Sequence, residues 1–504
     1  MTCRRRAGSV SCRWDKRLCL PGGERGSEST QPRAAIMSHL TLPEADPAPG
    51  APLLRRLRAE TATLLKLAWP MMIAQASRMG LNVIDTVMVG QASTQELAYL
   101  GMGRALNWVA IISGIGLMAG ISVFAARAVG AGDPRRCGDI MRQGLLYALA
   151  LGAALTALIL LLARPVLQLA GIAPDLVDGG VAFSAAISLG YIPTLVGSAA
   201  YFFLQGIGRP KPGMIITTSA LPLNVFLNWV FIYGNLGAPA LGATGAALAT
   251  ALAVTLTTLV ELGYLRWMSD AERYGVLDRG WRRAWREGRA LRRFGFAPGL
   301  ATMLDLLGLN TLAVWAGRFG AAVAAGFQIL LSLHLIVLII GISLATAASV
   351  RVGNAYGAQQ WREIGLRCWL ASALSVLTMA LLVAVLYPNL SLAIRPFNPD
   401  AATAAAAIAQ LRAFTPFMLF DGVAFVLMLS LRSAGDEVVA SVLQIVGYLG
   451  VALAAATVLV VGFGMGGVGL ALAFGIGMLF TALAMAWRFR IVAARLAARA
   501  KAGP

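Results

Sequence analysis

The sequence has few charged residues, few histidines and no recurring cysteine pattern, and these shortages exclude most classes of soluble enzyme. Only 13% of its 504 residues are charged and 58% are hydrophobic, whereas a soluble domain has about 25% charged and about 45–50% apolar residues. The five cysteines and two histidines form neither a disulfide framework nor a metal-binding motif. There is no Walker motif and no Ser-His-Asp arrangement, and the Gly-x-Gly runs lie inside apolar segments rather than after strands. We therefore predict a membrane protein that is not an enzyme and needs no cofactor.

The formal net charge of +19 raises the alternative of a nucleic-acid partner. However, the basic residues lie in short loops between apolar segments, where they determine membrane orientation. No basic patch is interleaved with aromatic residues, as it is in many nucleic-acid-binding proteins. The alternate loops, at residues 234–239 and 461–467, carry no charge. We therefore expect a multi-pass protein of the cell inner membrane that contacts lipids and has both termini in the cytoplasm.

Residues 1–50 contain no apolar run long enough for a signal peptide. They are rich in Arg, Gly and Pro, include Cys3, Cys12 and Cys19, and are expected to be disordered. One hypothesis places the true start at Met37, with the first 36 residues arising from an upstream start codon. An intact mass that begins at Met1 would contradict this hypothesis.

The apolar residues form segments long enough to cross a membrane, since a spanning helix needs about 20 mainly apolar residues. We predict twelve such segments and hence an all-α polytopic membrane protein with two six-helix lobes. The first lobe covers residues 60–268 and the second 294–490, with a connector at 269–293 and a basic tail at 491–504. The predicted spans are residues 67–90, 100–130, 142–163, 181–206, 213–235, 240–267, 295–317, 321–350, 367–393, 406–431, 438–462 and 466–488.

The second half of the sequence repeats the first. Three short motifs recur in the same order at nearly the same shift, which makes a chance match implausible. The pairs are Pro70 with Pro298 (shift 228), Val129–Ala131 with Tyr356–Ala358 (227) and Leu241–Ala249 with Met465–Ala473 (224). Six spans in each half would make the lobes parallel repeats, related by an axis along the membrane normal. Such lobes commonly enclose a central site that opens alternately to either side, so the repeat indicates a carrier.

The connector at residues 269–293 contains Trp281 and Trp285 among eight arginines. This pattern predicts an amphipathic helix that lies on the anionic inner leaflet of the membrane. The alternative is a solvated linker between the lobes.

Three aspartates lie inside predicted spans: Asp85 in the first, Asp305 in the seventh and Asp421 in the tenth. An ionisable residue at membrane depth is costly and is therefore a functional candidate. A carboxylate there can carry a proton, supply an oxygen ligand to Na⁺, or provide the counter-charge for a cationic substrate. The alternative is a structural acid, paired with Arg78 or Arg412 or placed near the membrane interface.

Amide side chains are the second group of candidates. Asn224 and Asn228 stand one helical turn apart in the fifth span, so their side chains share a face. Pro222, just before them, frees backbone carbonyls that can bind an ion. The first and seventh spans contribute further amides, namely Gln75, Asn82 and Asn310. The alternative is hydrogen bonding between helices, worth about 1 kcal/mol for each group.

Two basic or titratable residues lie close to these candidates. His334 lies on an otherwise apolar helix, where a packing role is favoured over a proton relay. Arg78 lies two turns before Asp85 on nearly the same face, so it either pairs with an acid or faces an aqueous vestibule.

Together these residues resemble the multidrug and toxic compound extrusion (MATE) family, in particular its bacterial NorM-type branch. The resemblance extends over residues 60–490, and its motifs fall in order at the expected spans. The motifs are Pro70 followed by residues 83–90 (VIDTVMVG), then 130–133 (GAGD), 205–212 (QGIGRPKP), 223–234 (LNVFLNWVFIYG), 242–250 (GATGAALAT) and 348–354 (ASVRVGN).

The resemblance implies twelve helices around a central cavity and the export of organic, often cationic, compounds in exchange for inward Na⁺ or H⁺. It implies that Asp85 is the essential acid of the first lobe, with Asn224 and Asn228 beside it. It also implies that Asp305 and Asp421 are cation-binding acids of the second lobe, so a coupling H⁺ or Na⁺ would bind either at Asp85, Asn224 and Asn228 or at Asp305 and Asp421. This sequence differs from the branch at Asp305, which is typically Glu, and at Phe327-Gln328, where the family pattern is His-Gln.

Three hypotheses follow. The leading one is a secondary multidrug antiporter that takes small organic molecules and works as a single chain. The second is a flippase for lipid-linked precursors from the same superfamily, which would need a strongly basic cavity. The spans are instead acidic and amide-rich, with Arg78 and Arg104 as exceptions. The third is an uncoupled channel or scaffold, which the duplicated lobes and paired acids disfavour.

Overall fold

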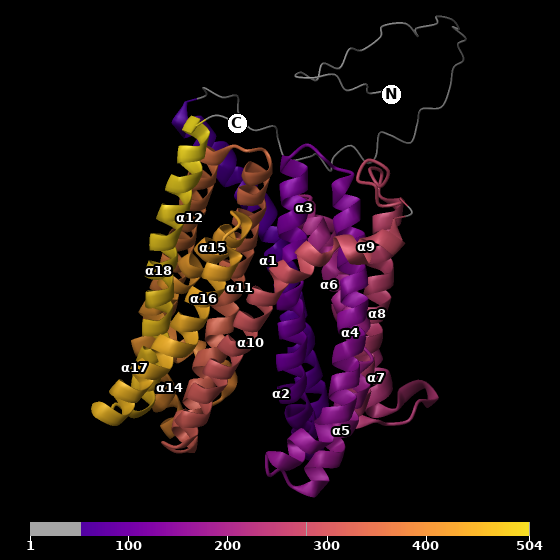
Figure 1. Cartoon of the computed structure of the whole chain (residues 1–504). Helices are drawn as coiled ribbons and strands as arrows, with labels where there is room; N and C mark the ends of the chain where they lie inside the picture. The colour runs from indigo at the N-terminus through magenta and orange to yellow at the C-terminus, as the bar shows by residue number, and fades with distance from the viewer. Residues whose placement is uncertain (1–51, 279, 503–504) are drawn as a thin grey trace, which may run out of the picture. The chain divides into compact units, whose positions relative to one another are not determined.

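The computed structural model describes residues 52–278 and 280–502, which form helices joined by short loops (Figure 1). The predicted tail at residues 1–50, with Met37 and its three cysteines, lies outside the described residues. The helices of the first lobe are α1 Leu53–Ala92, α2 Thr94–Leu117, α3 Gly120–Gly130, α4 Arg136–Leu169, α5 Pro174–Ser188, α6 Tyr191–Gly206, α7 Pro210–Tyr233 and α8 Gly242–Trp267.

The second lobe follows the short connector helix α9, Trp281–Glu287, and again consists of consecutive helices joined by loops. Two segments of π-helix, Val446–Val451 and Thr457–Gly462, flank α17 and extend the eleventh span. The α-helices of this lobe are α10 Arg289–Gly317, α11 Ala321–Gly357, α12 Trp361–Leu386, α13 Leu390–Ala393, α14 Ala401–Phe414, α15 Met418–Ser433, α16 Glu437–Ile445, α17 Ala452–Ala456 and α18 Gly466–Ala502.

Each of the twelve predicted spans corresponds to one helix or to consecutive helices, so the predicted fold class is confirmed. Within the described residues, ten segments are long and apolar enough to cross a membrane, or eleven when α5 and α6, bent by 43°, count as one span. The segment that falls short is α1, because Gln75, Arg78, Asn82 and Asp85 lower its hydropathy. The helices also extend past the predicted boundaries: α10 begins at Arg289, and α18 continues to Ala502.

The lobes meet where α1 and α3 pack against α11 and where α2 packs against α10. We call the end of the helices where α1 begins and α18 ends the basic end, because its loops and the adjoining first turns of helices carry Arg135, Arg136, Arg209, Lys211 and Arg362. The lobes approach closely at this end. A Cβ atom added to Gly130 of α3 would lie 2.0 Å from the carbonyl oxygen of Asn354 in α11. A Cβ atom added to Gly357 would lie 1.9 Å from the carbonyl oxygen of Arg127 in α3.

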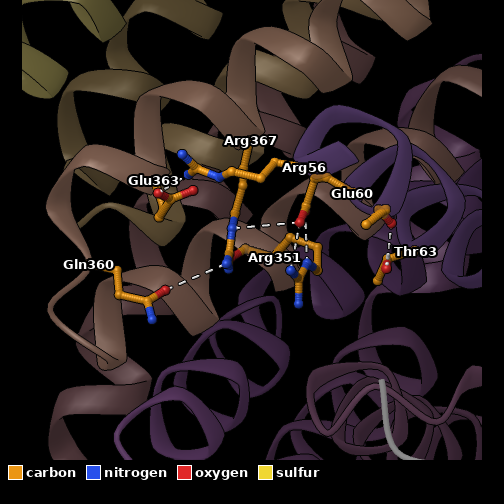
Figure 2. A network of polar contacts seen from close by, with 8 residues as sticks. Arg56, Glu60, Thr63, Arg351, Gln360, Glu363 and Arg367 are labelled. Atoms are coloured by element: carbon orange, nitrogen blue, oxygen red, sulfur yellow. Dashed lines mark hydrogen bonds and ion pairs between the residues drawn. The ribbon is translucent and has the colours of Figure 1, made fainter. Parts of the chain in front are cut away.

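A buried ion-pair network also joins the lobes, between α1 of the first and α11 and α12 of the second (Figure 2). The Arg351 guanidinium of α11 donates two hydrogen bonds to the Glu60 carboxylate of α1, over 2.7 and 2.6 Å. Arg367 of α12 lies 3.8 Å from the same carboxylate and donates to the Arg351 carbonyl over 3.0 Å. Next to them, Arg56 of α1 forms an ion pair with Glu363 of α12. Glu60 is 8% exposed, so the paired charges offset much of the cost of its burial.

The connector differs from the long amphipathic helix predicted for residues 269–293. Its first part packs on α4, because the buried Arg142 donates hydrogen bonds to the Gly275 carbonyl over 2.6 Å and to the Asp278 carbonyl over 3.2 Å. Its helical parts are α9, whose Trp281 and Trp285 are exposed, and the start of α10 from Arg289. The predicted helix was too long because residues 269–277 form turns, with Gly275 at a φ of 62° that an α-helix does not accommodate.

Candidate functional site: a buried carboxylate in each lobe

Asp85 lies on the buried face of α1, in the half of the helix away from the basic end, and is 6% exposed. Both of its carboxylate oxygens accept hydrogen bonds. Asn228 Nδ2 of α7 donates to Oδ1 over 2.8 Å, and Thr250 Oγ1 of α8 donates to Oδ2 over 2.8 Å. Hydrogen bonds to a charged group contribute about 1.5–3 kcal/mol each, so these two offset part of the cost of burying the carboxylate. The site therefore combines one acid of α1 with neutral polar groups of α7 and α8.

The amides around Asp85 form a closed network. Asn228 Nδ2 also donates to Asn224 Oδ1 over 3.1 Å, and Asn224 Nδ2 donates to Thr250 Oγ1 over 3.0 Å. Both asparagines are fully buried, as expected for side chains one turn apart on the inner face of α7. The Asn228 Oδ1 atom is buried and has no hydrogen-bond partner among the described residues. It therefore remains an acceptor beside the carboxylate.

Thr250 was not among the predicted site residues. It lies on α8, which the sequence marks as a helix of small apolar residues, and its hydroxyl connects Asp85 with Asn224. A threonine in a membrane helix usually donates to the carbonyl four residues before it, as Thr255 does here. The available signal was the position of Thr250 at the end of the motif at residues 242–250, but sequence alone does not show which carboxylate its hydroxyl reaches.

The basic residue that acts on Asp85 is Arg104 of α2, rather than Arg78. Arg104 is the cation whose charge acts on the Asp85 carboxylate, and its guanidinium donates to the Thr86 hydroxyl over 2.7 Å. Arg78 instead lies over the Tyr201 ring of α6, 4.7 Å from the ring centroid. The two residues of α1 are nearly aligned along the helix, but Arg78 turns towards α6.

The second lobe holds a different arrangement around Asp421, which is 3% exposed on α15. The Tyr448 hydroxyl donates to its Oδ1 atom, and His334 Nε2 lies 3.7 Å from its Oδ2 atom. The His334 ring also packs edge-on against Phe414 and Phe474. His334 thus has a packing role and also faces an acid. Tyr448 reaches Asp421 from within the π-helical segment Val446–Val451, and π-helical turns often occur at functional sites.

Asp305 of α10 belongs to a chain of polar side chains in the same lobe. Gln444 of α16 donates to Asp305 Oδ2, and Gln444 Oε1 accepts a hydrogen bond from Arg432 Nη2 over 2.6 Å. Asp305 Oδ1 has no hydrogen-bond partner among the described residues. Asp305 and Asp421 act on each other electrostatically, and Arg432 acts on Asp305. The second lobe therefore holds two acids with an arginine close to one of them, whereas the polar groups bonded to Asp85 are all neutral.

The structure brings together most, but not all, of the predicted site residues. Asp85 joins Asn224 and Asn228, while Asp421 joins His334 and influences Asp305. Three predicted amides lie outside both clusters, and in the described residues no hydrogen bond joins them to an aspartate. Asn82 donates to the Arg78 carbonyl over 3.1 Å, while Gln75 is half-buried and Asn310 is exposed.

The two clusters are suited to small cations. Carboxylate and amide oxygens are ligands for hard cations such as Na⁺, and a buried carboxylate can also hold a proton. Within the described residues, no group of three or more His, Cys, Asp or Glu side chains is placed to bind a metal ion. The Asp85 cluster thus offers one acid with neutral oxygens, whereas the second cluster offers two acids near an arginine.

Comparison with known proteins identifies the family of this fold and site. The family model described as MatE matches residues 70–230 and 299–458, one segment in each lobe. The eukaryotic MATE transporter AtDTX14 has the same fold, with a TM-score of 0.80 and 19% identity over 88% of this chain and 99% of that one.

Curated bacterial relatives agree with the family model. The "Probable multidrug resistance protein NorM" of Caulobacter vibrioides is 30% identical over 83% of this chain and 87% of its own length. The protein of the same name from Bradyrhizobium diazoefficiens is 31% identical over 87% of this chain and 95% of its own. The chain therefore belongs to the MATE family of membrane transporters, in its bacterial NorM-type branch.

Proposed function

We propose that this protein is a secondary multidrug antiporter, which exports organic, mostly cationic, compounds in exchange for H⁺ or Na⁺. The observation that carries the proposal is the Asp85 cluster: one buried carboxylate that accepts hydrogen bonds from the neutral side chains of Asn228 and Thr250. Such a group is costly to bury as an anion and can be neutralised by a proton, by Na⁺ or by a cationic substrate. The names of the NorM relatives, which are multidrug resistance proteins, agree with this role.

We propose further that the basic end faces the cytoplasm and that the membrane is the cell inner membrane. The arginines of the short loops at this end support this orientation, because basic residues are retained on the cytoplasmic side. In this orientation the Glu60–Arg351 ion pair and the Gly130 and Gly357 contacts close the lobes on the cytoplasmic side. Transport then requires the lobes to separate at this end and to close at the other.

Exchange follows if the cation and the substrate favour different arrangements of the lobes, or if both compete for Asp85. A proton or Na⁺ bound at Asp85 removes the negative charge that would attract a cationic compound. Release of the cation restores this charge. One chain contains both of the lobes that must separate and close during this cycle. We therefore propose that it works as a monomer.

The alternative function, transport of a lipid-linked precursor, is favoured by the basic residues Arg78 and Arg104 at membrane depth. Such a substrate carries a pyrophosphate and needs positive charge that is not already offset. Arg104 acts on Asp85, and Arg78 lies over the Tyr201 ring. Both arginines thus already have neighbours within the first lobe, which favours the antiporter.

The test is ethidium or norfloxacin efflux from proteoliposomes, with a Na⁺ gradient and a pH gradient imposed separately. We expect one of the two gradients to drive efflux, which would identify the coupling ion. Absence of efflux with either gradient would contradict the antiporter and would favour the lipid substrate.

A further inference from the structure

The first lobe contains a second buried acid, Glu261, that is separate from the Asp85 cluster. Glu261 lies on α8, two turns before the helix ends at Trp267, and is 5% exposed. Asp85 accepts its hydrogen bond from Thr250 of the same helix, eleven residues earlier. At about 1.5 Å per residue, Glu261 and Thr250 are about 16 Å apart along α8. Glu261 is therefore on the side of Asp85 nearer the basic end.

The Glu261 carboxylate fits into space left by two glycines. A Cβ atom added to Gly197 of α6 would lie 3.6 Å from Glu261 Oε2, and one added to Gly213 of α7 would lie 3.5 Å from Glu261 Oε1. The same added atoms would lie only 2.6 Å from the Thr258 hydroxyl and 2.4 Å from the Tyr201 ring, respectively. Larger residues at either position would fill the space around the carboxylate. Thr258 and Tyr201 enclose the carboxylate together with these two glycines, and we call this buried polar surrounding of Glu261 the chamber.

One face of α6 lines this chamber, because Gly197, Tyr201 and Gln205 follow one another at intervals of four residues. Tyr201 is 1% exposed and Gln205 is 5% exposed, and the two side chains are neighbours. Glu261 Oε1 is buried and has no hydrogen-bond partner among the described residues, while the Tyr201 hydroxyl and Gln205 Oε1 have none beyond each other. Buried polar groups are nearly always satisfied, so the open position on the Glu261 carboxylate points to a proton or a small ion there.

The charged neighbours limit what this species can be. Arg78 of α1 is the cation that acts on Glu261, and its guanidinium lies over the Tyr201 ring. No ion pair between Arg78 and Glu261 is present in the described part of the chain. Among the described residues, Arg78 acts electrostatically on Glu261 and on Tyr201, and α7 approaches the carboxylate at Gly213. One acid with neutral oxygens suits a small monovalent cation rather than a divalent ion.

We propose that Glu261 is a second binding site for a small monovalent cation, H⁺ or Na⁺, placed between Asp85 and the basic end. The proposal rests on the antiporter function proposed above, because the site gives the coupling cation a position after it leaves Asp85. Tyr201 and Gln205 supply neutral oxygens, and Thr258 is held in place by donating to the Pro193 carbonyl over 2.9 Å. Arg78 stabilises the empty, anionic Glu261 and thereby favours release of the cation.

The test uses dicyclohexylcarbodiimide, which reacts with protonated carboxyl groups in apolar surroundings, on the full chain in lipid nanodiscs. Mass spectrometry then locates the adducts. We expect an adduct on Glu261 that decreases as the pH is raised from 6 to 8.5. A further decrease with Na⁺, but not with choline, would assign Na⁺ to the site, whereas no effect of Na⁺ would assign the proton. Glu60 is an internal control, because it is equally buried but bonded to Arg351, and should not react.

A second measurement is needed in case the reagent does not reach the chamber. The cation concentration that gives half-maximal transport should change at least about tenfold in Glu261→Gln, because a charge-assisted contact is lost. The control Glu272→Gln changes an exposed acid of the connector and should have no effect. An unreactive Glu261 combined with unchanged cation dependence in Glu261→Gln would overturn the proposal. Labelling does not depend on transport, so failure of the antiporter function would be recognised separately, by the absence of wild-type efflux with either gradient.

Discussion

Gly130 and Gly357 occupy equivalent positions in the two lobes, and each lies against the backbone of the other lobe. Gly130 faces the Asn354 carbonyl, and Gly357 faces the Arg127 carbonyl three residues before Gly130. The sequence repeat therefore appears in space as a reciprocal contact, at the end where the lobes are closed. Close approach of backbones without side chains permits two helices to pack tightly inside a membrane.

Replacement of Gly357 by Ala should weaken this contact. The added methyl group would meet backbone atoms rather than a flexible side chain, so we expect a loss of about 1–3 kcal/mol from overpacking. Thermal unfolding of the purified protein should show a lower Tm. The matched control is Gly365→Ala in α12, where no atom lies within 4 Å of the added Cβ. An equal decrease in Tm for both variants would contradict the role of the contact.

The buried Glu60–Arg351 ion pair should contribute more to stability than the neighbouring Arg56–Glu363 pair. Glu60→Gln removes the negative charge between two buried arginines, and such changes cost about 3–5 kcal/mol. Glu363→Gln affects a pair in which both side chains are 29% exposed, where a pair contributes about 0–1 kcal/mol. Unfolding midpoints measured side by side should therefore differ clearly. The two pairs would have to be regarded as equivalent if the midpoints coincided.

The Thr250 hydroxyl should matter for transport. Thr250→Val keeps the shape of the side chain but removes the hydrogen bond to Asp85, and we expect transport to fall about tenfold, corresponding to about 1.4 kcal/mol. Thr250→Ser keeps the hydroxyl and should retain most of the activity. Initial rates of substrate efflux from proteoliposomes give the comparison. Equal rates for the Val and Ser variants would show that the hydroxyl is dispensable.

In the second lobe, Arg432 and Asp305 should behave as a charge-compensated pair connected through Gln444. Asp305→Asn leaves the buried Arg432 without the negative charge that offsets it, so the Tm should fall. The double variant Asp305→Asn/Arg432→Met removes both charges and should recover part of the loss, because coupled residues give non-additive effects. Additive losses in the double-mutant cycle would mean that the two charges do not interact.

The sequence was sufficient to predict the helices and part of the site. The lengths of the apolar segments identify all twelve spans, and the four-residue spacing of Asn224 and Asn228 predicts their common face. The partners of Asp85 on other helices were only partly predictable, because they depend on how each helix is rotated and tilted. Thr250 and Arg104 belong to this second group.

Long side chains and local breaks in helices account for the remaining differences. Arg78 is aligned with Asp85 along α1, but its length and flexibility allow it to reach Tyr201 on another helix. Tyr448 is placed by a π-helical segment, which shifts the register of every residue after it and leaves no clear mark in the apolar pattern. Glu261 lies at the end of a span, where an acid normally reaches the interface, and only packing against Gly197 and Gly213 shows that it is enclosed.

The most direct test of the central claim is gradient-driven ethidium efflux from proteoliposomes that contain Asp85→Asn. The amide keeps the size of the side chain but cannot be ionised, so the exchange of cation and substrate should be lost. The control is Asp178→Asn, which changes an exposed acid paired with Arg164 and should transport normally. We predict efflux at background level for Asp85→Asn under both Na⁺ and pH gradients. Efflux at the wild-type rate in this variant would contradict the assignment of Asp85 as the coupling residue.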